Sequence, residues 1–183
     1  MLPVVNTIES VDSVDLAEKI SRRAVARGIT VGVLLEVNES GEASKSGCDP
    51  AHAIRIAQKI GTLDGLELQG LMTIGAHVDD ETTIRKCFAH LRKTRDLILA
   101  SKTPGTERCL ELSMGMTGDM ELAIAEGSTI VRVGTAIFGE RAVHLAVGPY
   151  GSWPAGNDHG APPIGGMDCR GGDAKIVAFE GDA

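Results

Sequence analysis

The most constraining feature of the sequence is a regular alternation of short apolar runs with longer amphipathic segments. Two runs, 31–37 and 68–74, are apolar on both faces, which is typical of strands buried in a parallel sheet. Runs near 109–114 and 129–133, with a leading run at 4–8, indicate further strands. Strands that alternate with helices form right-handed βα units. The sequence therefore predicts about five such units, with the helices outside a parallel sheet.

The segments between the runs have the apolar spacing and the end signals of helices. Each begins near a residue suited to cap a helix N-terminus, and most end at a glycine. The expected helices start at Asp12 or Ser13, at Asp49-Pro50, near Asp79-Asp80 and at Thr117, and they end at Gly28, Gly61, about Ala100 and Gly127.

The chain length limits how far the sheet can close. An eight-stranded (β/α) barrel typically takes about 250 residues, and this chain has 183. We therefore expect an α/β fold that is either an open sheet or part of a barrel, spanning residues 1–142. Residues 143–183 are rich in glycine and proline and predict a loop-like or disordered tail, dispensable for the core, in which only 175–179 could form a strand.

Composition argues against several functional classes. The formal net charge is -7 without clustered Lys and Arg, which argues against nucleic acid as a partner. No apolar run approaches the roughly 20 residues of a spanning helix, and no secretory signal is recognisable, so we expect a cytoplasmic protein. The cysteines form no Cys-x-x-Cys pair and the histidines no His-Glu-x-x-His pattern, which predicts reduced thiols and no metal site.

Ligand sites in parallel α/β folds lie at the carboxyl ends of the strands. The segment Ser113–Thr117 joins an expected strand to an expected helix through small and hydroxyl residues, and Gly134-Thr135 repeats this arrangement one strand later. Backbone N–H groups in two such turns could hold one phosphate. Arg132 would point into the barrel interior, where a guanidinium could bond a ring nitrogen or an anion. Alternatively, the first segment is only a capped turn and Arg132 pairs with an acidic neighbour.

Two other strand ends carry ionisable residues. His77 with Asp79 and Asp80 could act in acid–base chemistry, but the aspartates serve equally well as helix caps, which is the interpretation we favour. Lys45 is the lysine of a strand-end loop, and a solvated loop lysine is far commoner than one that forms a Schiff base.

Several segments resemble a known family. The stretch Leu112–Glu121, followed by Ala125–Gly139, is similar to the C-terminal signature of the YggS/PROSC proteins. Asn38, the Ser-Lys-Ser-Gly segment at 44–47 and the segment 70–74 match the middle strands and loops of that family. The resemblance covers roughly residues 3–142.

The resemblance implies a fold, a cofactor and site residues. The family has a (β/α) barrel like the N-terminal domain of alanine racemase, and it holds pyridoxal 5'-phosphate (PLP) through a lysine near the end of its first strand. By this resemblance, Ser113, Gly115, Gly134 and Thr135 would surround the PLP phosphate, and Arg132 would lie by the pyridine nitrogen. The family is implied to bind PLP in intracellular PLP homeostasis without catalysing a defined reaction.

The chain departs from this family pattern at both ends. Val4 corresponds to about the fourth strand, so the segment with the PLP lysine has no counterpart, and the residues after about 142 are foreign to the family. We therefore expect a truncated PLP-binding protein that forms no internal aldimine. The alternatives are a PLP-dependent racemase-like enzyme and a half-barrel that binds no ligand. The open barrel edge could mediate self-association.

Overall fold

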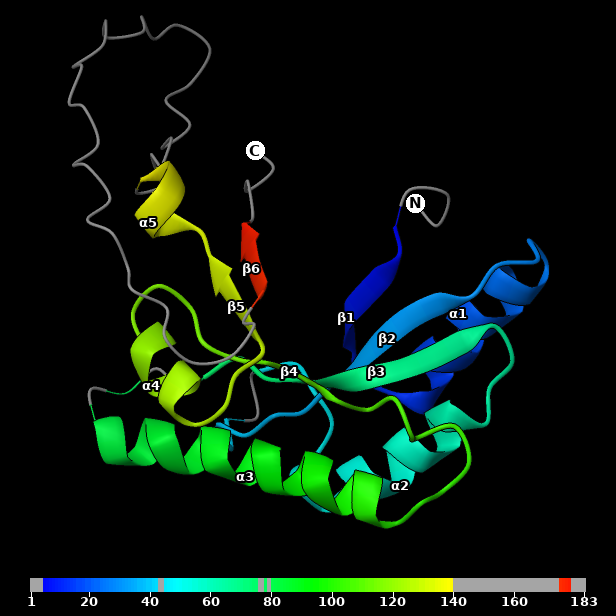
Figure 1. The fold of residues 1–183 in the computed structure, drawn as a ribbon, viewed down its shortest axis with the longest axis horizontal. Coiled ribbons are helices and arrows are strands. Elements are labelled where there is room, and N and C mark those ends of the chain that lie inside the picture. The colour runs from blue at the N-terminus through cyan, green and yellow to red at the C-terminus, as the bar shows by residue number, and fades with distance from the viewer. Residues whose placement is uncertain (1–4, 43–44, 76–77, 79, 140–174, 179–183) are drawn as a thin grey trace, which may run out of the picture.

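A computed structural model describes residues 5–42, 45–75, 78, 80–139 and 175–178 (Figure 1). Strands and helices alternate along the chain almost throughout. In chain order the elements are β1 (Thr7–Val11), α1 (Val14–Val25), β2 (Val31–Glu36), α2 (Pro50–Gly61), β3 (Leu66–Met72), α3 (Glu81–Ala100), β4 (Glu111–Ser113), α4 (Met120–Ala125), β5 (Ile130–Val133), α5 (Thr135–Phe138) and β6 (Lys175–Ala178).

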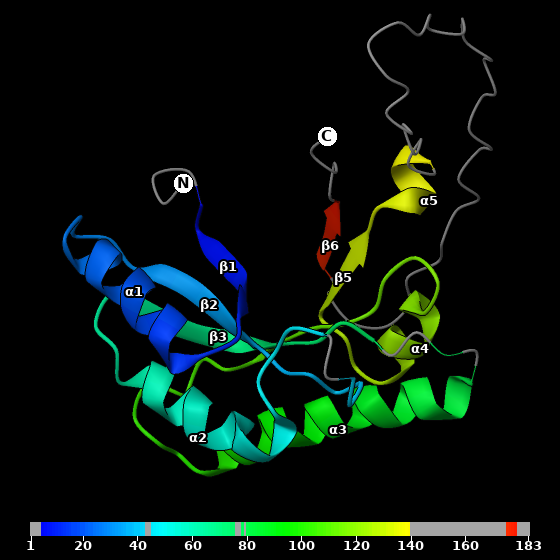
Figure 2. The ribbon, with the colours of Figure 1, turned by 180° about the vertical axis from the view of Figure 1, so that it is seen from behind.

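The strands form a single parallel sheet in the order β1-β2-β3-β4-β5-β6. Figures 1 and 2 show α1 to α4 on one side of the sheet, while the opposite face curls inward and is not covered by any helix of the described residues. This arrangement confirms the expected partial (β/α) barrel, with five βα units and one additional strand. β1 and β6 are the two edges of the sheet.

Alternation along β2 separates an outer core from the inner face. Val33 and Leu35 are fully buried in the large cluster between the sheet and the helices, together with Phe88 of α3. The intervening Leu34 belongs to a smaller cluster with Met72 of β3 and Ile130 of β5. Because successive strand residues point to opposite faces, this smaller cluster marks the concave inner face of the partial barrel.

The N-termini of three of the four expected helices begin at the residues that the sequence predicted as caps. Ser13 caps α1, Asp49 caps α2 with Pro50 at its first position, and Asp80 caps α3 through the Thr82 and Thr83 N–H groups, as expected. Asp79, the other aspartate considered as a cap, lies outside the described residues, as does His77.

The expected start of the fourth helix was wrong. Thr117 lies in a turn, and α4 begins only after Asp119. The Asp119 N–H donates to the Met116 carbonyl at 3.2 Å, and the Asp119 carboxylate accepts from the Met116 N–H at 2.6 Å. These reciprocal bonds close a separate turn, which delays the helix.

The leading strand was also expected too early, at 4–8 instead of Thr7–Val11. The signal was missed because Glu9 and Ser10 make the second half of β1 polar, whereas Val4 and Val5 are apolar. The short helix α5 follows Gly134, where a second strand-to-helix turn was expected. In the tail, Lys175–Ala178 forms a strand, as the sequence allowed, and the remaining residues after 139 lie outside the described part.

Two further expectations concern membranes and thiols. Among the described residues, no helix is long and apolar enough to cross a membrane. Cys48, Cys87 and Cys109 are free thiols, and burial raises the pKa of Cys48 and Cys109 to about 12. These two thiols are therefore protonated packing residues at neutral pH.

Candidate ligand-binding site

Arg132 of β5 anchors the inner face of the sheet near the carboxyl ends of the strands. One terminal guanidinium nitrogen donates to Ser113 Oγ on β4 at 2.7 Å, and the other donates to the Thr73 carbonyl after β3 at 2.8 Å. Ser113 Oγ in turn donates to Glu9 Oε2 on β1 at 2.6 Å. These bonds join four strands, and Arg132 is only 7 % exposed.

The guanidinium lies in an acidic surrounding. Burial lowers the pKa of Arg132, whereas the carboxylates of Glu9, Glu36 and Asp119 act in the opposite direction. Glu36 is 5 % exposed on the inner face of β2, and burial raises its pKa above the ordinary value, helped by Asp12 and opposed by Arg132. The three carboxylates therefore favour the charged guanidinium but do not fully offset the effect of its burial.

The two turns predicted to hold a phosphate lie next to one another. Thr135 Oγ1, at the start of α5, is 3.2 Å from Thr117 Oγ1 in the turn after β4. The Arg132 N–H also donates to the Gly115 carbonyl at 3.0 Å, which fixes the first turn to β5. Gly134 is the residue before α5, so the first N–H groups of that helix follow it.

Gly115 has a packing reason to be glycine that involves no ligand. Its φ is 93°, and a Cβ there would lie 2.5 Å from the Cβ of Ala123 in α4. Ser113 is likewise fully buried, with its hydroxyl already engaged by Glu9 and Arg132. Thr117 and Thr135 are the exposed hydroxyl residues of the two turns.

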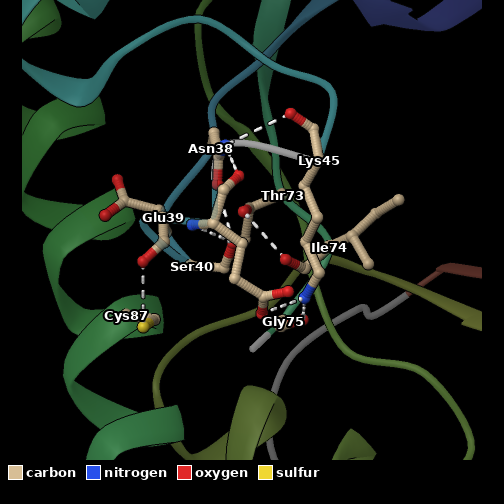
Figure 3. A network of polar contacts seen from close by, with 9 residues as sticks. Asn38, Glu39, Ser40, Lys45, Thr73, Ile74, Gly75 and Cys87 are labelled. Atoms are coloured by element: carbon tan, nitrogen blue, oxygen red, sulfur yellow. Dashed lines mark hydrogen bonds and ion pairs between the residues drawn. The ribbon is translucent and has the colours of Figure 1, made fainter. Parts of the chain in front are cut away.

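The loop after β2 is fixed by its own polar network (Figure 3). The Asn38 side-chain amide donates to the Glu42 carbonyl at 2.8 Å and accepts from Ser40 Oγ at 2.7 Å. Lys45 Nζ donates to the Gly75 carbonyl at 3.1 Å and pairs with Glu42 Oε1 at 2.9 Å. Lys45 therefore ties the β2 and β3 loops together, and its ammonium is engaged.

The same loop is attached to α3. Glu39 Oε2 lies 2.8 Å from His90 Nδ1. The Glu39 carbonyl accepts a hydrogen bond from Cys87 Sγ at 3.2 Å. Burial raises the pKa of Glu39, and the His90 contact opposes that effect. No group of His, Cys, Asp and Glu among the described residues is arranged to hold a metal ion.

Two hollows of about 460 Å³ each open at this end of the sheet. One lies between the start of α3 and the turn before α4, and it includes Thr117 and Gly118. The other lies beside the β2 loop and includes Asn38 and Lys45. The first hollow reaches the predicted phosphate turn but does not include Ser113 or Arg132.

The structure brings together Ser113, Gly115 and Arg132 of the predicted site, and it places Thr135 beside the same turn through Thr117. Sequence reasoning missed Glu9 and Glu36. A signal was present for Glu36, because an acidic residue within an expected strand requires a partner or a polar face. Glu36 was read only as the end of an apolar run, and Glu9 lay beyond the expected strand.

Comparison with known proteins defines the class. Residues 4–142 match the family described as alanine racemase, N-terminal domain. The alanine racemase of Clostridium difficile shares the fold at 16% identity and a TM-score of 0.58, covering 69% of this chain and 34% of that one. The family match and the fold thus define a partial barrel of the alanine racemase N-terminal type.

Proteins with higher sequence identity to this chain indicate a branch within this family. Pyridoxal phosphate homeostasis proteins of Helicobacter pylori and Vibrio cholerae are each 42% identical over 134 residues, 73% of this chain and 57% and 55% of theirs. PipY of Synechococcus elongatus with PLP bound is 34% identical, with a TM-score of 0.65, covering 73% of this chain and 61% of that one. A crystal structure of an unknown protein from Bifidobacterium adolescentis is 90% identical, with a TM-score of 0.74, covering 75% and 55%.

The chain belongs to the alanine racemase N-terminal domain family, and these relatives confirm its resemblance to the YggS/PROSC branch. It spans little more than half the length of the curated relatives it matches.

Proposed function

We propose that this chain carries the phosphate-side and ring-nitrogen-side parts of a PLP site and serves PLP homeostasis without catalysing a defined reaction. The observation that carries the proposal is the buried Arg132, held at the carboxyl ends of the strands beside two adjoining strand-to-helix turns. Relatives named for PLP homeostasis and a relative solved with PLP bound support it.

The residues present fit the chemistry of this ligand. A phosphate dianion needs convergent N–H and hydroxyl donors, which the turns containing Thr117 and Thr135 can supply beside Gly134. The ring nitrogen needs a directed donor on a buried surface, which Arg132 can supply. In this assignment Ser113 and Gly115 shape the site through Arg132 and α4, and the phosphate contacts come from the more exposed turn residues.

When bound, PLP supplies an aldehyde that can condense with an amine. The Lys45 ammonium is held by the Gly75 carbonyl and Glu42, so it is poorly placed to attack that aldehyde. We therefore keep the expectation that the chain forms no internal aldimine, and with it the assignment as a non-enzyme. Cytoplasmic location and the lack of a nucleic-acid partner likewise remain predictions.

The test is a titration of PLP and of inorganic phosphate, followed by NMR amide shifts. Wild type should show shifts near Ser113 and Thr135 with both ligands. Gly134→Val should block the backbone approach, and Thr135→Val should weaken binding by removing one hydroxyl while keeping the side-chain shape. Gly28→Ala, at the opposite ends of the strands, is the control. The proposal is wrong if these amides do not move, or if they move equally in Gly134→Val.

A further inference from the structure

Glu9 lies at the inner face, and the PLP assignment gives it no part. It lies on β1, an edge of the sheet, yet its carboxylate reaches Ser113 on β4, 104 residues away in the chain. The bond is 2.6 Å long and crosses the inner face past β2 and β3. Glu9 therefore touches the group that holds Arg132 and not Arg132 itself.

The direction of each proton in this chain of contacts is determined by chemistry. A guanidinium can only donate hydrogen bonds, and an ionised carboxylate can only accept them. The single Ser113 hydroxyl hydrogen therefore goes to Glu9, and a Ser113 lone pair accepts from Arg132 at 2.7 Å. Ser113 has no hydrogen left for a ligand. The remaining N–H groups of Arg132 are the donors available beside it.

Arg132 donates to one main-chain oxygen, the Thr73 carbonyl, and to one side-chain oxygen, the Ser113 hydroxyl. Of these two acceptors, only the hydroxyl can change its orientation. The Thr73 carbonyl belongs to the segment directly after β3 and is held by the sheet, since the Thr73 N–H bonds the Ser113 carbonyl at 3.0 Å. The Ser113 hydroxyl, in contrast, can rotate about its Cβ–Oγ bond unless an acceptor fixes it. Glu9 is that acceptor.

We propose that Glu9 is a positioning residue that acts through Ser113: it fixes the hydroxyl so that Arg132 is held at two points and presents only N–H donors to an acceptor atom of the bound ligand. For PLP this rests on the proposed function. The remaining carboxylates near Arg132, Glu36 and Asp119, attract the guanidinium but form no hydrogen bond with it among the described contacts.

The first experiment needs no ligand. Side-chain 15N NMR of Arg132, assigned by Arg132→Lys, should give separate, slowly exchanging guanidinium signals in the wild type. Glu9→Ala removes the acceptor and should merge or broaden these signals. Glu9→Asp keeps the charge but withdraws the carboxylate by one methylene, and it should do the same. Glu9→Gln keeps an acceptor at the same reach and should largely restore the signals. Glu18→Ala, on the outer helix α1, is the control.

The second experiment measures PLP affinity. Glu9→Ala and Glu9→Asp should raise the PLP dissociation constant about tenfold, as expected for the loss of the hydrogen bond that fixes the Ser113 hydroxyl, and Glu9→Gln, which keeps an acceptor, should stay near wild type. The assignment fails if Arg132 signals and PLP affinity are unchanged in Glu9→Asp, whether or not Glu9→Ala folds. If the wild type binds no PLP, the proposed function fails, and the ligand-free Arg132 signals still decide the role of Glu9.

Discussion

The effect of burial on the charge of Glu36, at the inner face, can be tested by measuring protein stability at different pH values. Its pKa is raised mainly by burial, so the folded protein holds this proton more tightly than the unfolded chain does. The stability that comes from protonated Glu36 is therefore fully present below the ordinary pKa of 4.5 and is lost as the pH rises through the raised pKa.

Glu36→Gln should consequently stabilise the protein at neutral pH, by about 1 kcal/mol or about 3 °C in the thermal midpoint. The gain should disappear below pH 4.5, where both side chains are neutral. Thermal unfolding followed by circular dichroism between pH 4 and 8 measures this, with Glu18→Gln on the outer helix α1 as the control. A variant that is less stable at neutral pH would show that Arg132 outweighs the burial of Glu36.

At this scale the sequence predicted some site residues and not others. The sequence shows where β4 and β5 end, and these strand ends carry Ser113, Arg132 and Thr135. Because neighbouring parallel strands end at the same edge of a sheet, the proximity of these residues could be expected. Glu9 could not be, because its partner Ser113 is reached only through the curvature of the sheet across the inner face. A linear pattern contains the period of a strand but not the curl of the sheet it joins.

Among the described glycines, Gly105 leaves the least room for a side chain, because it packs against Gly61 at the end of α2. A Cβ on Gly105 would lie 1.9 Å from the Gly61 carbonyl oxygen, and the Gly105 φ is 84°. Gly28 has a similar φ of 63° but open space around it. The two positions therefore separate backbone strain from steric overlap.

Gly28→Ala should cost about 1–2 kcal/mol, the usual penalty for a left-handed alanine. Gly105→Ala should cost about 2 kcal/mol more, because the end of α2 and the segment before β4 must move apart. Urea unfolding of both variants gives the comparison. Equal costs would mean that this contact relaxes easily and does not fix α2.

The N-cap of α3 provides an element-scale test that depends on pH. The Asp80 carboxylate accepts from the Thr83 hydroxyl and from the Thr82 and Thr83 N–H groups, which lowers its pKa. The capping stability is therefore present above the ordinary pKa of 3.8 and is lost as the pH falls through the lowered pKa.

Asp80→Ala should lower the thermal midpoint at neutral pH, and the difference from wild type should shrink as the pH falls below 3.8. Asp80→Asn retains a capping oxygen and should lose less at neutral pH. A difference between Asp80→Ala and wild type that does not change with pH would assign the effect to something other than the charged cap.

At the scale of the molecule, the described part of the chain is a partial barrel with β1 and β6 as its outer strands. Local sequence signals predicted its parallel βα units, and the resemblance to the YggS/PROSC family predicted a partial barrel. Doubly apolar runs, capped helices and chain length together define parallel βα units too few to close. Such local signals could not predict that β6 pairs with β5, because 41 residues separate Val133 from Lys175 and no local pattern connects them. Long-range pairing of this kind is decided by the open edge of β5.

β6 changes what we expect from removing the tail. The sequence suggested that residues 143–183 are dispensable, but β6 pairs with β5 over four register positions, from Ile130 with Lys175 to Val133 with Ala178. All four residues of β5 are buried in the described structure. A chain ending at Gly139 would expose the backbone donors and acceptors of β5 along that edge, and an unpaired strand edge recruits another strand.

We therefore expect the chain ending at Gly139 to self-associate and to melt a few degrees lower than the full chain. Size-exclusion chromatography with light scattering, over a range of concentrations, measures the association. The full-length variants Ile176→Pro and Val177→Pro are a matched pair, because alternate residues of a parallel strand bond to a given neighbour and proline removes one donor. One of the two should weaken β6 pairing and reproduce the association in part, while the other should behave like wild type. A monomeric truncated chain with an unchanged midpoint would contradict this and restore the tail as dispensable.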